Sequence, residues 1–147
     1  IHYHMVGIPQ IKEELIKEAT ALGVMDSITF HGVLSDADTA ALLKSSDVFM
    51  MLSQKTSDGD FEGFGIAILE GNALGVPAIG SENCGISDAI NHGYSGFLVD
   101  PFSLEAINSA IIKLLDKKDY YRNNAQLHAK NFTWELIVKK YLSIIES

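Results

Sequence analysis

The sequence has little cysteine, little positive charge and no long hydrophobic run, and each shortage excludes a class of protein. A single cysteine, Cys84, cannot form an intrachain disulfide, which favours a cytoplasmic protein over a disulfide-stapled secreted one. Lysine and arginine total 11 against 19 acidic residues, so the net charge of -8 offers no basic patch for nucleic acid. No apolar run approaches the roughly 20 residues that span a bilayer, and we expect no direct membrane insertion.

The remaining composition is that of a globular domain with an ordinary core. The chain has 147 residues, of which 47% are hydrophobic, and it contains no internal repeat or linker. We therefore expect one domain over residues 1–147.

Short apolar runs alternate with helical periodicity along the whole chain, which is typical of βαβ units. This rhythm predicts an α/β fold with a doubly wound parallel sheet and additional helices at the C-terminal end. A doubly wound half normally opens with one more βα unit, so we expect the chain to lack its first unit. Strands are predicted at 2–6, 27–30, 48–52, 77–80 and 96–99, and helices at 10–22, 35–45, 65–74, 88–90, 103–115, 120–130 and 133–145.

Several local signals refine these boundaries. Gly23 is placed where a left-handed residue ends a helix, and Gly32 is expected to break the second strand. Ser35 followed by Asp38 predicts a capping box, and Ser103 predicts another helix cap. The apolar residues 48–52 do not alternate with polar ones, which indicates a central strand covered by helices on both faces.

The most informative segment runs from Glu62 to Glu70. Its turn follows the strand 48–52 and opens a helix, at the carboxyl end of the sheet where open α/β folds bind ligands. Gly63 and Gly65 have no Cβ atoms, so the backbone can approach a ligand closely. Free N–H groups of the first helical turn can then hold a phosphate or a sugar hydroxyl.

The two carboxylates of this segment are too far apart to act on one bond. On a continuous helix eight residues separate them by about 12 Å and about 80°, beyond the roughly 5–9.5 Å of paired glycosidase carboxylates. We interpret Glu62 and Glu70 as two anchors for one extended ligand. The alternative is that both are exposed or helix-capping carboxylates; this explanation suits Glu62 alone, but it is weak for Glu70 in the second helical turn.

The order and spacing of these motifs resemble the C-terminal domain of retaining GT-B glycosyltransferases of glycosyltransferase family 4, a Rossmann-like half of the GT-B fold. The segment Glu62–Glu70 continuing into Gly75-Val76-Pro77 is the most specific part of the resemblance. The other matching parts are Met5-Val6-Gly7 with Pro9, Ile28 to Val33, Asp47-Val48 with Ser53, Gly93 with Gly96 to Val99, and Phe132-Thr133-Trp134.

The resemblance implies a donor site for a nucleoside diphosphate sugar, with no metal and no other cofactor. Glu62 would be the catalytic residue, contacting the donor sugar near its reacting carbon, and Glu70 would bind the ribose hydroxyls. The nucleobase would lie against the loop formed by Gly32, Val33 and Leu34. The backbone amides that would hold sugar hydroxyls and phosphate are those of Gly63, Phe64, Gly65 and Ile66.

The resemblance also implies what lies elsewhere. The family's diphosphate-binding arginine and lysine belong to the preceding βα unit, and an acceptor glycan or lipid-linked glycan would bind an N-terminal domain. We therefore expect this chain alone to be inactive, with an exposed central strand that favours self-association. The alternatives are a non-catalytic sugar-nucleotide-binding or interaction domain and a GT-B fold epimerase.

Two further groups of side chains, two histidines and three aromatic residues, are candidates for a functional or a packing role. His2 and His4 share one face of a predicted strand and could form a metal pair, but no cysteine or carboxylate lies at ligand spacing. We interpret them as strand residues. The aromatic residues Tyr120, Tyr121 and Trp134 are expected to pack the terminal helices against the sheet.

Overall fold

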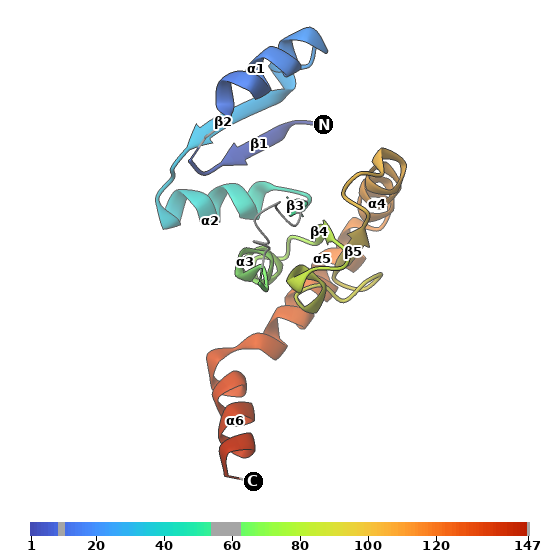
Figure 1. Ribbon diagram of the computed structural model, residues 1–147. Helices are drawn as coiled ribbons and strands as arrows, with labels where there is room; N and C mark the ends of the chain where they lie inside the picture. The colour runs from blue at the N-terminus through green and yellow to red at the C-terminus, as the bar shows by residue number, and fades with distance from the viewer. Residues whose placement is uncertain (9–10, 54–62, 147) are drawn as a thin grey trace. The chain divides into compact units, whose positions relative to one another are not determined.

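The computed structural model describes residues 1–8, 11–53 and 63–146, in which parallel strands alternate with helices as the sequence predicts (Figure 1). The α/β fold class is therefore confirmed. The strands are β1 (Tyr3–Val6), β2 (Ile28–Gly32), β3 (Phe49–Met51), β4 (Ala78–Ser81) and β5 (Gly96–Val99). The α-helices are α1 (Lys12–Ala21), α2 (Asp36–Ser45), α3 (Ile66–Ala73), α4 (Leu104–Asp116), α5 (Lys118–Ala129) and α6 (Trp134–Ile145), and the 3₁₀ helices are η1 (Met25–Ser27), η2 (Gly85–Asp88) and η3 (Lys130–Phe132).

The chain forms two compact units, Ile1–Ala41 and Leu42–Ser147. In the first unit β1 and β2 form a parallel pair, with Tyr3 opposite Ile28 at one end and Val6 opposite Gly32 at the other. The expectation that Gly32 ends the strand is confirmed, since Gly32 is the last residue of β2. Its φ of +68° turns the chain there, while its carbonyl still accepts a 2.9 Å hydrogen bond from the Gly7 amide.

In the second unit, the strand order is β3-β4-β5, with parallel pairing throughout. Because successive strand residues point to opposite faces, Ala78 and Ile79 enter different hydrophobic clusters. Residues of β3 also pack against both clusters, which confirms that this strand is covered on two faces. Its predicted central position stays a prediction, because β3 is at the edge of the described three-stranded sheet. The first cluster contains Ile79, Phe97, Val99, Ala110, Leu114 and Tyr121, and the second, on the side of α3 and η2, contains Ile68, Ala78, Ile86, Ala89 and Ile90.

The described strands form a parallel pair, β1-β2, in the first unit and a three-stranded parallel sheet, β3-β4-β5, in the second. In each, strands that follow one another along the chain are neighbours, as in each half of a doubly wound fold. The expectation of a further βα unit stays a prediction, as does the extent of the domain over residues 1–147.

The predicted helix ends are confirmed where a specific side chain or glycine defines them. Gly23 has a φ of +69° after α1. The hydroxyl of Ser35 donates to Asp38 Oδ2 at 2.6 Å and accepts from the Asp38 amide at 3.2 Å, at the start of α2. At the start of α4, the Ser103 hydroxyl accepts from the Ala106 amide at 3.2 Å.

The remaining differences concern short helices and one aromatic residue. The sequence did not predict η1 or η3, and the helix expected at 88–90 is η2, which ends at Asp88. Tyr121 is buried and packs on Phe97 as expected. Trp134 is 80% exposed, so the prediction that it packs against the sheet is wrong. Trp134 is the first residue of α6, and none of the described residues of this helix is buried.

None of the helices in the described residues is long and apolar enough to cross a membrane.

Candidate functional site

The turn before α3 leaves backbone donors at its helix start. Gly65 is the N-cap residue of α3, with φ +75° and ψ 53°, and it has no side chain that could cap the first-turn amides. The Ile68 amide donates to the Gly65 carbonyl at 2.9 Å, which tightens the turn. The amides of Ile66 and Ala67 have no acceptor within the helix, as is general for a helix start. This is the geometry that binds anionic or hydroxyl-bearing ligands.

The two glycines of the turn have different structural roles. A Cβ atom on Gly65 would lie 3.1 Å from Ile68 Cδ1 and 3.3 Å from Ile86 Cγ1, and the positive φ would add strain. Gly65 is therefore required by the fold. A Cβ atom on Gly63 would meet no described atom within 4 Å, and Gly63 has no positive φ. Packing against the described residues therefore does not explain this glycine, and the close approach of a ligand there stays a prediction.

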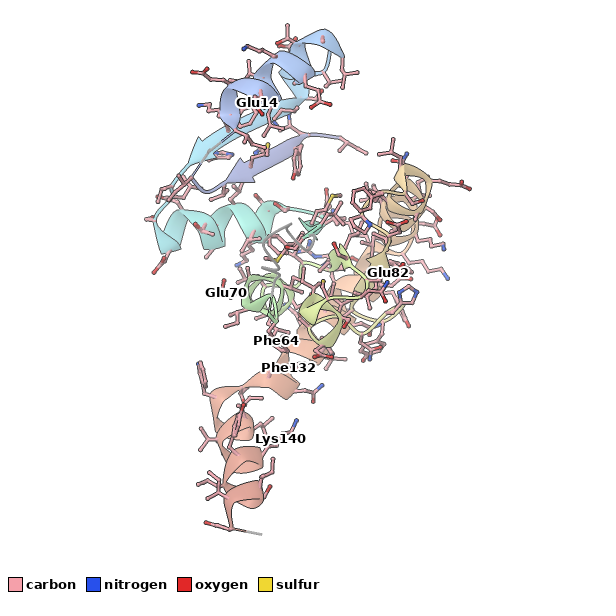
Figure 2. The ribbon with its side chains drawn as sticks, viewed as in Figure 1. Glu14, Phe64, Glu70, Glu82, Phe132 and Lys140 are labelled. Atoms are coloured by element: carbon pink, nitrogen blue, oxygen red, sulfur yellow. The ribbon has the colours of Figure 1, made fainter. Side chains whose placement is uncertain are left out.

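Phe64 contributes its side chain to the protein interior. Its ring packs against the second hydrophobic cluster and lies 5.8 Å from the ring of Phe132, centroid to centroid (Figure 2). A ligand at this turn would meet the backbone of Phe64, which agrees with the predicted role of its amide and gives the ring an anchoring role.

The exposed row of α3, which we define as Ile66, Glu70 and Ala73, follows the spacing of one helix face, and Gly63 lies in the turn before it. Ile66 is 62% exposed, and Glu70 is exposed one turn further along. The Glu70 carboxylate makes no hydrogen bond or ion pair with any residue that the structure describes, and Figure 2 shows it on α3. A carboxylate that has no partner among the described residues and is flanked by exposed apolar groups can accept two vicinal hydroxyls.

The predicted base loop lies in the first unit. Gly32 borders a pocket of about 320 Å³ at the carboxyl ends of β1 and β2. Val33 is 75% exposed and Leu34 is half-buried. The pocket is mainly apolar, and Lys12 lies with its Nζ 5.7 Å from the centroid of the Phe30 ring. A mainly apolar pocket with few polar groups is suited to a flat heterocycle.

The predicted site residues thus fall into three groups. Gly63, Phe64, Gly65, Ile66 and Glu70 come together on one turn and one helix of the second unit. The loop 32–34 belongs to the first unit. Glu62 lies outside the described residues, so its catalytic role and its separation from Glu70 stay predictions.

The histidines form a larger group than the sequence indicated. His4 Nδ1 lies 2.9 Å from His31 Nε2, and the ring centroids of His2 and His4 are 4.7 Å apart. Desolvation lowers the pKa of His4 below 6.5, and the neighbouring charges of His2 and His31 lower it further. Within the described ranges, no three His, Cys, Asp or Glu side chains are arranged to hold a metal ion. The prediction of metal-free chemistry is untested by this.

Two residues near the turn were missed by the sequence analysis as site components. The Phe132 ring contacts Phe64, and the His128 ring lies edge-on to Phe132 at 5.0 Å. The sequence shows the aromatic motif Phe132-Thr133-Trp134, but only the tertiary structure shows that Phe132 pairs with Phe64, 68 positions earlier.

Comparison with known proteins links these features to one family. The family model described as "Glycosyl transferases group 1" matches residues 1–131. The chain is 34% identical over 116 residues to a GDP-mannose-dependent alpha-(1-6)-phosphatidylinositol monomannoside mannosyltransferase of Mycobacterium tuberculosis, covering 78% of this chain and 30% of that protein. It is 30% identical over 113 residues to the amylovoran biosynthesis glycosyltransferase AmsK of Erwinia amylovora, covering 76% of this chain and 28% of that protein.

Solved structures share the fold over nearly the whole chain. A glycosyltransferase from Rickettsia africae has a TM-score of 0.79 at 25% identity, covering 98% of this chain and 39% of that one. HepE of Anabaena, crystallised with UDP and glucose, has a TM-score of 0.79 at 21% identity, covering 99% and 40%. The chain therefore spans about 30% of the length of these curated relatives and about 40% of these structures.

Proposed function

This chain belongs to the group 1 glycosyl transferases, and we propose that it is the donor-binding domain of such an enzyme. The whole enzyme would transfer a sugar from a nucleoside diphosphate sugar and keep the anomeric configuration of that sugar. The observation that carries the proposal is the exposed row of α3. This row joins a helix start that has no side-chain cap to a carboxylate that makes no hydrogen bond or ion pair with any residue that the structure describes. Helix N-termini bind phosphate, and carboxylates bind vicinal hydroxyls.

Each part of the donor has a proposed location. The amides at the start of α3, from Gly63 to Ile66, hold the diphosphate and sugar hydroxyls, and their dipoles stabilise the charge on the departing diphosphate. Glu70 accepts the ribose hydroxyls. Glu62 contacts the donor sugar near the carbon whose bond to the diphosphate breaks. Gly32, Val33 and Leu34 of the first unit are the proposed contacts of the nucleobase, and Gly32 borders the pocket of that unit.

The comparisons support a nucleotide-linked donor without identifying it. The mannosyltransferase of M. tuberculosis depends on GDP-mannose, and HepE was crystallised with UDP. We therefore treat both uridine and guanosine diphosphate sugars as candidates. An acceptor glycan or lipid-linked glycan would bind to a part of the whole enzyme that precedes this domain, and the reaction would take place in the cytoplasm.

Calorimetry of the full-length protein with UDP-, GDP- and ADP-sugars tests the proposal. We expect one nucleotide class to bind and Glu70→Gln to weaken that binding by about 10- to 100-fold, the equivalent of a charge-assisted hydrogen bond of about 1.5–3 kcal/mol. The matched control is Glu105→Gln, which changes an exposed carboxylate in the first turn of α4. Absence of nucleotide-sugar binding by the wild-type protein would overturn the proposal.

A transfer assay separates the enzyme from its alternatives. The full-length protein should transfer the donor sugar to an acceptor, and the product should keep the donor's anomeric configuration. Tight binding of a nucleotide sugar, with no epimerisation of that sugar and no transfer to any acceptor in a glycan panel, would favour the non-catalytic binding domain. An inverted product would contradict the retaining mechanism.

A further inference from the structure

The turn that we propose to bind the donor is held in place by side chains from the end of the chain. Phe64 is the only residue of the turn 63–65 with a large side chain, and its ring packs inward on the second hydrophobic cluster. The ring of Phe132, in η3, covers Phe64 at a centroid distance of 5.8 Å and an interplanar angle of 51°. This is within the range of favourable aromatic pairs.

Phe132 is itself positioned by His128 of α5. The two rings lie 5.0 Å apart in an edge-on arrangement at 64°. His128 Nε2 donates a hydrogen bond of 3.1 Å to the carbonyl of Ala89, the residue that follows η2. The hydrogen bond is part-buried, so the imidazole has a fixed orientation and the Phe132 ring has a fixed neighbour.

The contacts close into a ring of three segments. The turn 63–65 lies close to η2 at Gly65, where an added Cβ would come within 3.3 Å of Ile86 Cγ1. The segment η2 is joined to α5 through Ala89 and His128, and α5 continues into η3, which returns to Phe64. Figure 2 shows Phe64 and Phe132 side by side, below α3. Each segment therefore restricts the other two.

We propose that Phe132 and His128 are positioning residues for the donor-binding turn, acting through Phe64 without touching the donor. This inference rests on the proposed function of the turn. Amide donors bind a diphosphate well only when their directions are fixed before the ligand arrives, because ordering the turn afterwards costs free energy. The contact between Phe64 and Phe132 supplies that order, and His128 keeps Phe132 in place.

The test uses the full-length protein and two measurements on each variant. The first is the calorimetric Kd for UDP-glucose and GDP-mannose, and the second is amide hydrogen exchange at residues 63–68. Phe132→Ala should raise the donor Kd by about 10-fold and speed exchange at 63–68 by a similar factor, as expected for loss of an aromatic pair. Phe132→Leu, which keeps an apolar side chain, should fall between Phe132→Ala and the wild type and guards against a failure of Phe132→Ala to fold.

Two further variants separate positioning from general destabilisation. His128→Ala should act like a weaker Phe132→Ala, and His128→Gln should recover part of the loss because its amide can still donate to Ala89. Tyr141→Ala removes a 65% exposed aromatic side chain from α6 and should change neither measurement. In a transfer assay, Phe132→Ala should raise the donor KM and leave kcat at saturating donor nearly unchanged.

The outcomes distinguish this inference from the proposed function. If the wild-type protein binds no member of the panel of UDP-, GDP- and ADP-sugars, the proposed function fails, and exchange at 63–68 still decides whether Phe132 orders the turn. If the wild type binds and Phe132→Ala retains both its Kd and its exchange rates, the positioning role is wrong. Exchange that rises equally in β4 and β5 would also overturn it, because the effect would then be a general loss of stability.

Discussion

The two compact units bury their strands to different extents. Every residue of β4 in the second unit is buried, whereas three of the four residues of β1 in the first unit are exposed. Among the described residues, Ala19 is the one buried residue of the first unit. The turn 63–65 is therefore set by packing on a core, while the loop 32–34 depends on a strand pair held mainly by backbone and surface contacts. Substitutions in the second unit can be chosen to change either folding or ligand binding.

The largest effect should come from the contact between β4 and β5. A Cβ on Gly96 would lie 2.0 Å from the carbonyl oxygen of Ala78, a backbone atom that cannot move alone. We expect Gly96→Ala to lower the unfolding free energy by about 3 kcal/mol or more, measured by chemical denaturation. A well-folded variant with unchanged stability would show that the second unit is not organised around this strand pair.

The same substitution inside α3 provides the control with the opposite sign. A Cβ on Gly71 would make ordinary contacts of 3.6–3.8 Å with Phe49 and the Val76 carbonyl. Gly71→Ala should therefore raise stability by about 0.5–1 kcal/mol, because alanine is the better helix former. This pair shows whether the second unit responds to local packing as the structure implies.

An intermediate effect is expected at a buried polar residue of α3. Asn72 is fully buried, and neither atom of its amide has a hydrogen-bond partner in the described chain. Leucine has the same branched shape without the polar atoms, so Asn72→Leu should raise stability by about 1–3 kcal/mol. Asn123→Leu, at an exposed position of α5, should change it by less than about 0.5 kcal/mol. Loss of stability in Asn72→Leu would instead indicate that Asn72 is satisfied by water.

The smallest effect concerns pH and the first unit. The pKa of His4 lies below 6.5, chiefly through desolvation and then through His2 and His31. Below pH 6.5 the unfolded chain therefore binds more protons at His4 than the folded protein does. The free energy of unfolding is not reduced by His4 above pH 6.5, and it decreases as the pH falls toward the His4 pKa of the folded state. Hydrogen exchange of β1 should accelerate at pH 5.5 relative to pH 7.5. His4→Gln should reduce this pH dependence, and equal acceleration in both proteins would contradict it.

Most of the fold could be predicted because its signals are local. Periodicity located the strands and α-helices to within a few residues, and Ser35, Ser103 and Gly23 marked helix ends through contacts within a few positions. The 3₁₀ helices were missed or shifted because three- and four-residue segments carry no periodicity. Trp134 was misplaced because an amphipathic pattern shows that a helix has an apolar side and does not show what covers it.

The candidate site was predicted in part for the same reason. The glycine-flanked helix start and Glu70 are close in sequence, so their common turn and helix could be inferred. The sequence pattern does not distinguish Gly63 from Gly65, whereas the structure does, through the positive φ of Gly65 and the closeness of Ile68 and of Ile86, 21 residues beyond Gly65. The contacts of Phe64 with Phe132, and of His128 with Ala89, join segments distant along the chain and leave no local pattern.

The most direct test of the account is the donor Kd of the full-length Gly63→Ala protein, compared with its unfolding free energy. No described atom would contact the new methyl group, so the unfolding free energy of Gly63→Ala should stay within about 0.5 kcal/mol of the wild type. Gly65→Ala should instead lose about 2 kcal/mol, because of backbone strain and close contact with Ile68 and Ile86. If the turn binds the donor, Gly63→Ala should weaken nucleotide-sugar binding by about 10-fold or more, because the methyl group blocks the approach to the backbone. A stable Gly63→Ala protein that binds the donor as tightly as the wild type would contradict the account.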